Sequence, residues 1–442
     1  MGAAYAAPIF AQQASLCYTI LIMLDIKFIR ENKDLVASGA QKKHIDFNID
    51  ELLTADDLRR ALLLEVEAMR ARQNETAAAV ARATDDAIRT QMIVESKLVK
   101  EELQKKEEEL TNAMKKWQTL MLQVPNIPDM SVPEGATDAD NMEIKVWGEI
   151  PKFSFTPKGQ MELLQKHDMA DFERGTKISG FRGYVLKNDG ARLIFALSQF
   201  VLNELSAEGF TPLIVPSLVR RESLLGTGFL PQGEEDLYKT QDGDFLAGTA
   251  EVATMGYHMD EVLSSADLPK KYISFSPAFR REAGSHSRDV KGLIRVHEFF
   301  KWEQVILCEA SHEESVKHHE FLLQMSEKLM QKLKIPYHVV LNCAGDLGLG
   351  QVKKYDIEAW VPSEGKYRET HSASYFHDFQ TRRLNIRYRN KEGKMQFAHS
   401  LNNTAIATPR ILVPLLENYQ NEDGSITVPE ALRPYLGKDK IG

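Results

Sequence analysis

The sequence predicts an α+β protein in which a long helical hairpin precedes a larger domain built on antiparallel strands. Residues 55–123 contain no glycine or proline, and apolar residues recur there at helical spacing. Two strand-like runs within residues 272–305 flank a polar, glycine-containing loop, which is typical of an antiparallel pair. From Gln165 onward the chain mixes helical and strand-like stretches. These three observations indicate two structural domains of different character.

Length and composition are those of an ordinary globular protein. With 442 residues the chain is long enough for two or three domains with a sizeable core. The net charge of -8 argues against a protein that coats nucleic acid nonspecifically, but it is compatible with a local basic face. Cys17, Cys308 and Cys343 lie far apart, which indicates a reducing compartment and excludes a zinc site of the usual spacing.

The first 22 residues differ from the rest of the chain. Residues 1–22 are small and apolar, and they lack the basic region of a secretory signal. Their apolar run is too short to span a bilayer. Met23 opens a conventional sequence, so we expect it to be the natural start and residues 1–22 to be an extension of unknown role. We find no other stretch apolar enough for a membrane, and we expect a cytoplasmic protein.

The hairpin is predicted from two apolar rows and a plausible reversal near residues 84–90. Each helix would contain about 30 residues and extend about 45 Å. Pro125 and Pro128 end the second helix. The rows fit an a/d-like seam of an antiparallel coiled coil. They consist of Leu58, Leu62, Val66 and Met69 in the first helix, and of Val99, Leu103, Leu110, Met114, Trp117 and Met121 in the second.

A coiled coil is most often a structural or dimerising element, and that alternative is open for this hairpin. Its basic residues alternate with acidic ones, so much of the surface is a solvated face stabilised by pairs four residues apart. Lysine and arginine are nevertheless the residues that bind phosphate. The basic residues are Arg59, Arg60, Arg70, Arg72, Lys97, Lys100, Lys105, Lys106, Lys115 and Lys116.

After the hairpin we expect a linker and then a helix followed by a strand. Residues 126–158 open with a proline-rich, acidic stretch, which favours a linker into the second domain. Residues 193–208 are predicted as a helix. Residues 209–216 are predicted as a strand that ends at Pro216.

The segment FRREAGSHSRDVKGLIRVHEFFKWE, residues 279–303, carries the strongest chemical signal. The runs 272–277 and 293–305 on either side of its loop are predicted as strands. Arg295, Phe299 and Glu303 are each four residues apart, so on a strand they would project from one face. An arginine, an aromatic ring and a carboxylate suit a phosphate, a flat base and an amine or hydroxyl. The alternative is a half-buried hairpin with a charged solvent face.

Residues 279–303 closely resemble motif 2 of the class II aminoacyl-tRNA synthetases, in the version found in seryl-tRNA synthetases. The helix and strand ending at Pro216 resemble motif 1, the dimer-interface element. Residues 400–410, SLNNTAIATPR, with a helix at 411–420, resemble motif 3. The resemblance implies residues 23–130 as a tRNA-binding domain and residues 131–442 as a class II catalytic domain on an antiparallel sheet. It also implies a homodimer formed through the region around Pro216.

Two further segments acquire a meaning from this resemblance. Thr249-Ala250-Glu251 by itself is explained by a helix N-cap, whereas in the family such a loop closes over the serine amino group. Ala247 and Gly248 stand before it, where the family more often has Ile-Pro. Glu369 and Ser372 offer hard oxygen ligands for Mg²⁺. Thr370 and His371 depart from the family's Glu-Ile-Ser-Ser, and we interpret His371 as a tolerated substitution rather than an acid or base.

The implied reaction joins serine and ATP to give seryl-adenylate, with transfer to the 3′ end of tRNA-Ser, and of tRNA-Sec where that is present. The hairpin would grip the long variable arm of the tRNA. The catalytic residues would be Arg280 and Arg410. The serine contacts would be Thr249, Ala250, Glu251, Arg280, Glu303, Asn402 and Thr404. The ATP contacts would be Arg280, Arg281, Glu282, Arg295, Val296, Phe299, Glu369, Thr370, His371, Ser372 and Arg410, with Mg²⁺ at Glu369 and Ser372.

The resemblance also assigns individual roles. Arg280 would bridge the serine carboxylate and the α-phosphate. Phe299 would stack on adenine and Glu282 would contact the adenine edge. Arg295 and Arg410 would hold the γ-phosphate.

Asn403, Ala405 and Pro409 depart from the motif 3 pattern, which usually has glycines at these places. Proline ahead of Arg410 restricts a backbone that is usually flexible, so the local geometry should differ. Two alternatives are a catalytically silent, synthetase-like RNA-binding protein and a ligase that loads an amino acid onto a carrier protein. The presence of the ATP arginines argues against the first. The long hairpin and the lack of a cysteine or histidine cluster argue against the second.

Overall fold

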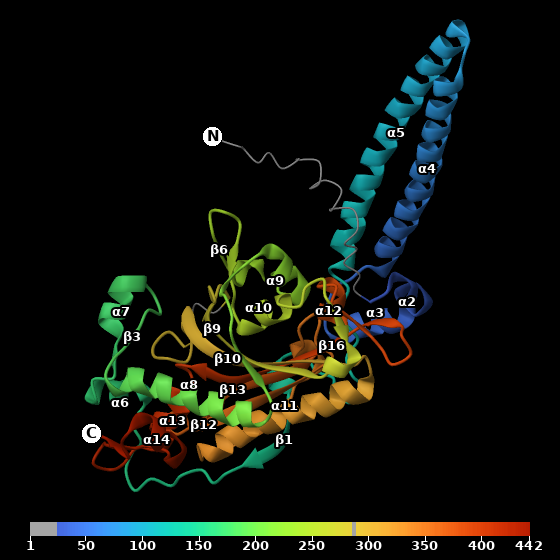
Figure 1. Cartoon of the computed structure of the whole chain (residues 1–442). Coiled ribbons are helices and arrows are strands. Elements are labelled where there is room, and N and C mark those ends of the chain that lie inside the picture. The colour runs from blue at the N-terminus through green and yellow to red at the C-terminus, as the bar shows by residue number, and fades with distance from the viewer. Residues whose placement is uncertain (1–23, 285–288) are drawn as a thin grey trace, which may run out of the picture. The chain divides into compact units, whose positions relative to one another are not determined.

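The computed structural model describes residues 24–284 and 289–442, so the expectations for residues 1–22 and for Met23 lie outside the described residues. The chain divides into two compact units. One contains residues 25–41 and 45–125, and the other contains residues 42–44 and 126–442. Figure 1 shows the first as a helical hairpin with two short helices at its base, and the second as a twisted sheet covered by helices.

The helical unit confirms the antiparallel hairpin. Short helices α2 (Ile26–Glu31) and α3 (Lys33–Lys42) precede the long helices α4 (Ile49–Arg82) and α5 (Asp86–Met121). Asn48 caps α4 by accepting a hydrogen bond from the backbone N–H of Glu51, and Asp85 caps α5 by accepting two. The reversal therefore occurs at residues 83–85, where a new N-cap begins the second helix.

The hairpin seam follows the predicted rows except at its base. Leu62, Val66, Leu103 and Leu110 are buried, as predicted, but Leu58 is 52% exposed. The seam passes instead through the next residue, Arg59, whose guanidinium lies 4.5 Å from the centre of the Trp117 ring. Asp56 fixes this arginine by accepting hydrogen bonds from its Nε and Nη2 at 3.1 and 2.6 Å. Leu58 was placed wrongly because an apolar pattern cannot reveal an arginine that stacks inward.

The second unit is organised around an eight-stranded sheet in which neighbouring strands are antiparallel except for the parallel edge pair β9 and β4. In spatial order the strands are β1 (Met142–Trp147), β11 (Tyr337–Leu341), β12 (Lys353–Val361), β13 (Lys366–Tyr375), β16 (His399–Thr408), β10 (Glu298–Cys308), β9 (Lys270–Phe279) and β4 (Thr211–Ile214). The antiparallel sheet confirms the predicted fold class.

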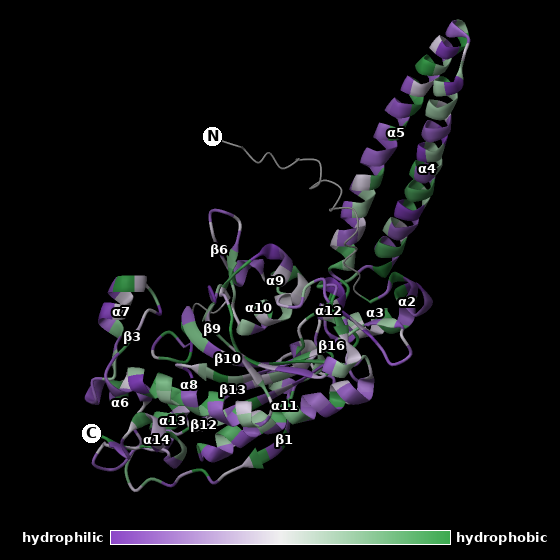
Figure 2. Cartoon of the chain, in the orientation of Figure 1, coloured by the Kyte–Doolittle hydropathy of each residue, from purple (hydrophilic) through white to green (hydrophobic). Residues whose placement is uncertain are grey.

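Helices cover both faces of the sheet, as Figure 1 shows. On one face α8 (Asp189–Ala207) and α11 (His312–Lys332) bury their apolar residues against the strands in the main core. On the other face α10 (Ala250–Gly256) packs against β9 and β10, and α9 (Arg221–Thr227) and α12 (Phe379–Arg383) lie beside it. Colouring by hydropathy shows the alternation of apolar and polar residues in these elements (Figure 2).

The remaining elements are short. The helices are α6 (Gln160–Lys166), α7 (Phe172–Ser179), α13 (Leu412–Asn418) and α14 (Arg433–Leu436). The strands outside the large sheet are β2 (Ala170–Asp171), β3 (Val185–Leu186), β5 (Leu218–Val219), β6 (Tyr238–Lys239), β7 (Phe245–Leu246), β8 (Val262–Ser264), β14 (Arg387–Arg389), β15 (Met395–Phe397), β17 (Ile426–Thr427) and β18 (Lys440–Ile441).

Most predicted elements occur where expected, but the linker was too simple a description. The predicted helix 193–208 falls almost wholly within α8, and the predicted strand 209–216 contains β4. Residues 126–158 include β1, which pairs with β11 and extends the sheet at one edge. Its sequence, Met-Glu-Ile-Lys-Val-Trp, alternates apolar and polar residues as a strand should, but the proline-rich stretch before it favoured a linker, and the strand was missed.

Among residues 24–284 and 289–442, we find no helix that is long and apolar enough to cross a membrane.

Lys43 is a buried cation within the second unit. It is 3% exposed, and its Nζ donates to the carbonyl oxygens of Gly348, Leu349 and Gln351 at 3.0, 3.0 and 2.6 Å. These acceptors carry no net charge, so burial lowers the pKa of Lys43 to about 7. The lysine therefore fastens the loop 348–351 through hydrogen bonds rather than through an ion pair.

We expect Lys43 to make stability rise with pH in the alkaline range. The unfolded chain keeps the lysine protonated up to its ordinary pKa of 10.5, whereas the folded chain releases this proton above about pH 7. The unfolded state then binds more protons, so the free energy of unfolding should increase by about 2 kcal/mol between pH 7 and pH 9. Lys43→Met should lack this increment, as measured by denaturant unfolding at both pH values.

Lys42→Met is the matched control, because this neighbouring lysine is half exposed and pairs with Glu134. Its pH dependence should follow that of the unaltered protein. If the stability of Lys43→Met changed with pH as much as that of the unaltered protein and of Lys42→Met, the pH dependence could not come from titration of a buried Lys43.

Candidate active site

One cavity of about 240 Å³ collects most of the residues singled out in the sequence. It lies on the α10 face of the sheet and is lined by β10, β13, β16, the loop before β10 and the start of α10. The predicted residues that line it are Thr249, Glu251, Arg280, Glu282, Arg295, Val296, Phe299, Glu303, Glu369, Thr370, Ser372, Asn402, Thr404 and Arg410.

Strand β10 supplies the floor of the cavity through alternate residues. Phe299, Lys301 and Glu303 project into it, as the two-residue period of a strand requires. Arg295 does not share this strand, because β10 begins only at Glu298; the predicted strand 293–305 was therefore too long. The loop before β10 is held by Gln160, which accepts the Leu293 N–H at 2.9 Å, and Arg295 reaches the cavity from that loop.

Two buried carboxylates share one lysine in the cavity. Glu251 and Glu303 are 5% and 2% exposed. The ammonium of Lys301 pairs with Glu303, and Thr249 donates to the same carboxylate at 3.2 Å. Burial, together with the charge of Glu303, raises the pKa of Glu251 to about 7. A cationic group entering the cavity here would balance the second carboxylate.

Thr249 serves two purposes at the start of α10. Its Oγ1 accepts the backbone N–H of Glu251 at 3.3 Å, so the simple N-cap interpretation of this threonine is correct as local structure. The same oxygen lies 3.4 Å from the Nζ of Lys301 and donates to Glu303. The cap thereby fixes the threonine against the acidic part of the cavity.

Three arginines converge on the cavity from separate segments. Arg280 follows β9; its guanidinium lies 5.4 Å from the centre of the Phe299 ring, and its Nε donates to the carbonyl of Gly248 at 3.3 Å. Arg410 follows β16 and donates to the carbonyls of Ile294 and Glu369 at 2.9 and 3.2 Å. Burial and the positive charges of Arg280 and Arg295 lower the pKa of Arg410. A polyphosphate would relieve this repulsion.

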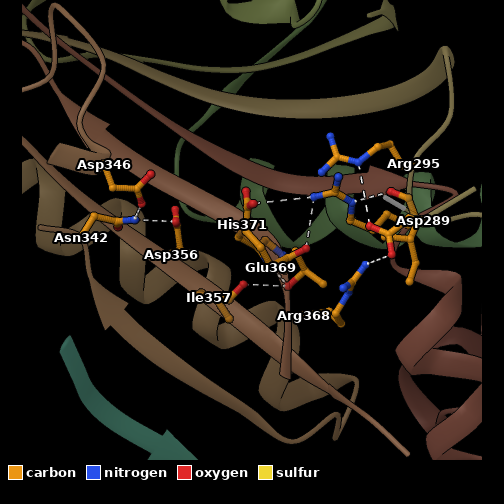
Figure 3. A network of polar contacts seen from close by, with 12 residues as sticks. Asp289, Arg295, Asn342, Asp346, Asp356, Ile357, Arg368, Glu369 and His371 are labelled. Carbon is orange, nitrogen blue, oxygen red and sulfur yellow. Dashed lines mark hydrogen bonds and ion pairs between the residues drawn. The ribbon is translucent and has the colours of Figure 1, made fainter. Parts of the chain in front are cut away.

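Arg295 is held by carboxylates rather than by carbonyls. It forms ion pairs with Glu282 and with Asp289, the latter at 3.9 Å, and Asp289 also pairs with Arg368. Figure 3 shows Arg295 and Arg368 approaching Asp289 from different sides. Glu282, which the resemblance assigns to the adenine edge, is thus engaged with an arginine in this structure.

Glu369 and Ser372 present oxygen atoms from β13 into the cavity. The Glu369 side chain is 51% exposed, and its carboxylate lies 3.9 Å from Arg410. Behind Ser372, Asp356 accepts a hydrogen bond at 2.7 Å from Asn342, as Figure 3 shows. Hard oxygens of this kind fit Mg²⁺. Within the described chain, groups of three or more His, Cys, Asp or Glu side chains that could hold a metal ion are absent, so phosphate oxygens or water would complete the coordination.

Three predicted residues do not line the cavity. His371 is buried; its Nδ1 meets the hydroxyl of Thr370 at 2.8 Å and its Nε2 meets the carbonyl of Ala405 at 3.0 Å, while burial lowers its pKa to about 4. Arg281 donates to the carbonyl of Glu235, and Ala250 is buried within α10. Direct ATP contact by His371 was predicted wrongly, because the register of β13 directs this side chain toward the neighbouring strand.

Strand β16 shows where one departure from the motif 3 pattern is accommodated. Asn402 and Thr404 face the cavity, whereas Asn403 points to the opposite face. The amide of Asn403 donates to the carbonyl of Leu322 and to the hydroxyl of Ser326, both on α11, at 2.7 and 2.9 Å. Asparagine thus replaces glycine on the packing side of the strand, away from the cavity.

Sequence reasoning missed several residues that line the cavity. The two-residue alternation between Phe299 and Glu303 would have identified Lys301. The same two-residue step from Ser372 would have identified Ser374, and Leu293, Ile294 and residues 407–409 lie inside the two motif segments. Chain position gave no signal for Phe229 and Gln351, which come from other loops. The missed residues are Phe229, Leu293, Ile294, Lys301, Gln351, Ser374, Ala407, Thr408 and Pro409.

Comparison with known protein families gives two matches. The model of the seryl-tRNA synthetase N-terminal domain matches residues 23–128. The model of the tRNA synthetase class II core domain (G, H, P, S and T) matches residues 238–419.

Whole-chain comparisons agree with these matches. A serine–tRNA ligase of Deinococcus radiodurans is 50% identical over 420 residues, which cover 95% of this chain and 99% of that protein. The seryl-tRNA synthetase of Pyrococcus horikoshii complexed with ATP has a TM-score of 0.84 and 38% identity, covering 95% of this chain and 99% of that one. A cytoplasmic serine–tRNA ligase from Naegleria fowleri in complex with AMP has a TM-score of 0.81 and 29% identity, covering 95% and 98%.

Two adjacent asparagines on β16 provide a paired test of this geometry. Asn403→Ala should lower the free energy of unfolding by about 1–3 kcal/mol, because buried partners on α11 lose their donor. It should leave serine-dependent ATP–pyrophosphate exchange near its original rate. Asn402→Ala should reduce that exchange at little cost in stability. Denaturant unfolding and exchange kinetics on both variants check this, and the reverse pattern would show that the faces of β16 are assigned wrongly.

Proposed function

The chain belongs to the seryl-tRNA synthetase family, and on that premise we propose that it activates L-serine with ATP and transfers the seryl group to the 3′ end of tRNA-Ser. The observation that carries this proposal is the composition of the cavity on the α10 face of the sheet. It combines three converging arginines with a buried group of two carboxylates and one lysine. The arginines suit a polyphosphate, and the acidic group suits an amino acid's ammonium.

Activation forms a bond between a serine carboxylate oxygen and the α-phosphorus of ATP, and pyrophosphate leaves. A carboxylate is a nucleophile at neutral pH, so the residues must position the reactants and offset charge rather than remove a proton. Arg280 holds the serine carboxylate next to the α-phosphate. Arg410 and Arg295 receive the γ-phosphate, and Phe299 stacks on adenine with Glu282 at its edge.

The acidic part of the cavity recognises serine itself. Glu251 binds the ammonium, and Glu303 and Thr404 receive the hydroxyl, with Thr249 and Asn402 completing the polar lining. Lys301 neutralises one carboxylate and the substrate ammonium neutralises the other. Because the hydroxyl partners are buried, alanine would leave them unpaired, so the site should reject alanine strongly.

Glu369 and Ser372 would hold Mg²⁺ together with the phosphates of ATP. The fit rests on their hard oxygens and on the exposed carboxylate of Glu369. The ion would offset phosphate charge when it is bound. The residues of the chain already direct positive charge at the same place through Arg410, whose Nη1 lies 3.9 Å from that carboxylate.

We further propose that the helical hairpin binds tRNA-Ser, and tRNA-Sec where that is present, in the cytoplasm. Several of its basic residues are occupied: Arg70 pairs with Glu107, Lys106 with Glu65 and Glu109, and Lys116 with Glu51. Exposed lysines and arginines suit phosphate recognition on an RNA arm. The other exposed basic residues of the predicted set are Arg60, Arg72, Lys97, Lys100, Lys105 and Lys115.

A homodimer through the motif 1 region is the second assembly we propose. The Phe195 side chain on α8 and the Ile214 side chain on the edge strand β4 are 75% and 86% exposed. Large apolar residues exposed on an edge strand and on an adjoining helix favour association. A second copy of this chain would cover them.

Serine should support ATP–pyrophosphate exchange, while alanine, glycine and threonine should not. Arg280→Ala and Arg410→Ala should each lower kcat/KM by about 10²–10³-fold, because each removes a charge that is already aimed at the reacting phosphates. Arg389→Ala is the matched control, since Arg389 is exposed on β14 outside the cavity. Absence of exchange with every amino acid would favour the silent RNA-binding alternative, and exchange without aminoacylation of tRNA would favour the carrier-protein alternative.

Charged substitutions in the motif 1 region should dissociate the dimer. Phe195→Glu combined with Ile214→Glu should shift the sedimentation coefficient from that of a dimer to that of a monomer, because charges would then be buried in an apolar contact. Met130→Glu is the control, since Met130 is fully exposed elsewhere in the same unit. A dimer that survives the double substitution would place the interface at another surface.

A further inference from the structure

Gln380 lies directly behind the acidic part of the cavity without lining it. It belongs to α12 and is 1% exposed. Its Nε2 donates to Oε1 of Glu251 at 2.6 Å and lies 3.2 Å from the carbonyl of Thr227. Its Oε1 accepts from the hydroxyl of Ser400 at 2.8 Å. One buried amide thus connects Glu251 to two other segments of the chain.

The orientation of this amide is determined by its partners. The NH₂ group meets a carbonyl, which can only accept, and the carboxylate of Glu251, which in its ionised form can only accept. The amide oxygen meets a hydroxyl that can donate. A flipped amide would place its oxygen against the Glu251 carboxylate, which is unfavourable for both groups. Ser400 and Thr227 therefore ensure that Gln380 presents an N–H to Glu251.

We infer that Gln380 is a positioning residue for serine activation: it holds one oxygen of the Glu251 carboxylate so that the carboxylate faces the substrate ammonium. The inference rests on the proposed role of Glu251 in binding that ammonium. Gln380 occupies Oε1 from the side away from the cavity, while Asn402 lines the cavity and favours the ionised form of Glu251. A neutral donor thus already holds the carboxylate before serine arrives.

The surroundings of Glu251 explain why a neutral donor is needed there. Burial and the neighbouring Glu303 both favour its protonated form, whereas Gln380, Lys301 and Asn402 favour the ionised form. The pKa of Glu251 is raised to about 7, so it titrates in the working range of an enzyme. Protonation would remove the charge that attracts the ammonium. Loss of the Gln380 donor should raise the pKa of Glu251 further. As the pH is lowered, Glu251 should then become protonated earlier, so serine binding should begin to weaken at a higher pH than in the unaltered protein.

Gln380→Met tests the inference, because methionine keeps the length of the side chain and removes the amide. At pH 7.5 we expect KM for serine in pyrophosphate exchange to rise by about tenfold or more, consistent with loss of a hydrogen bond to a charged group. KM for ATP should change by less than about twofold, since the lost contact lies at the amino-acid end. The pH below which serine KM increases should move upward.

Two further variants test the same arrangement. Gln380→Glu places a third acid beside Glu251 and Glu303, so it should move the pH profile in the same direction and further. Ser400→Ala removes the hydroxyl that orients the amide and should give a smaller shift of serine KM alone. Both remain informative if Gln380→Met folds poorly.

Gln420→Met is the matched control. Gln420 is another buried glutamine, and it donates to the carbonyls of Lys158 and Glu417 at 3.0 and 2.9 Å, outside the cavity. Its substitution should lower stability but leave serine KM and its pH profile unchanged.

The outcomes separate this inference from the proposed function. Equal changes in serine and ATP KM with an unshifted pH profile, or unchanged KM values, would show that Gln380 only packs α12, and the inference would be overturned. Glu251→Gln should raise serine KM at pH 8, where Glu251 is ionised, and should abolish the dependence of serine KM on the titration of this group. If Glu251→Gln leaves serine KM unchanged, Glu251 does not contact the ammonium. The proposed role of Glu251 would then be wrong, independently of the result for Gln380→Met.

Discussion

The structure of the cavity depends on the balance of charge at its buried acidic end. Glu251 and Glu303 are both buried, and Lys301 is the cation that pairs with Glu303. A buried carboxylate without compensation is costly, so the chain supplies neutral donors, Thr249 and Gln380, to support the ionised forms. On the proposed role of Glu251, the substrate ammonium would supply the second cation, which would make recognition a matter of charge as well as shape.

Alternate residues of a strand point to opposite faces of the sheet, and this separates the residues that line the cavity from those that pack in the core. On β10 the residues Phe299, Lys301 and Glu303 enter the cavity, while Trp302 and Ile306 enter the main core. On β16 the same separation places Asn403 against α11 and Asn402 in the cavity. A departure from a family pattern therefore matters according to the face on which it falls. Asn403 is accommodated by Leu322 and Ser326, and the cavity side of the strand retains its polar residues.

The sequence predicted the antiparallel hairpin, the antiparallel sheet and most of the cavity lining, because these depend on local periodicity and on motifs of fixed order. It failed where a contact depends on tertiary context. Arg59 replaces Leu58 in the hairpin seam by stacking on Trp117, and His371 turns toward Ala405. Gln380 gave no signal at all, since its partners Thr227, Glu251 and Ser400 come from distant parts of the chain. The roles assigned to the site residues are still proposals.

The arginines differ in how they are held, and this difference bears on how ATP enters. Arg410 is oriented by the carbonyls of Ile294 and Glu369, and the half-exposed Glu369 carboxylate lies 3.9 Å from its guanidinium. Arg295 is instead paired with Glu282 and Asp289, so on its proposed role a phosphate would have to replace these carboxylates before it gained the full attraction of the arginine. Arg410 would thus need little rearrangement to bind a phosphate, whereas Arg295 would have to exchange its carboxylate partners for the phosphate. On the proposed roles, that exchange would release Glu282 from Arg295 but not from Arg182, whose Nη1 lies 3.8 Å from its carboxylate, so an arginine would still orient Glu282 toward the adenine edge.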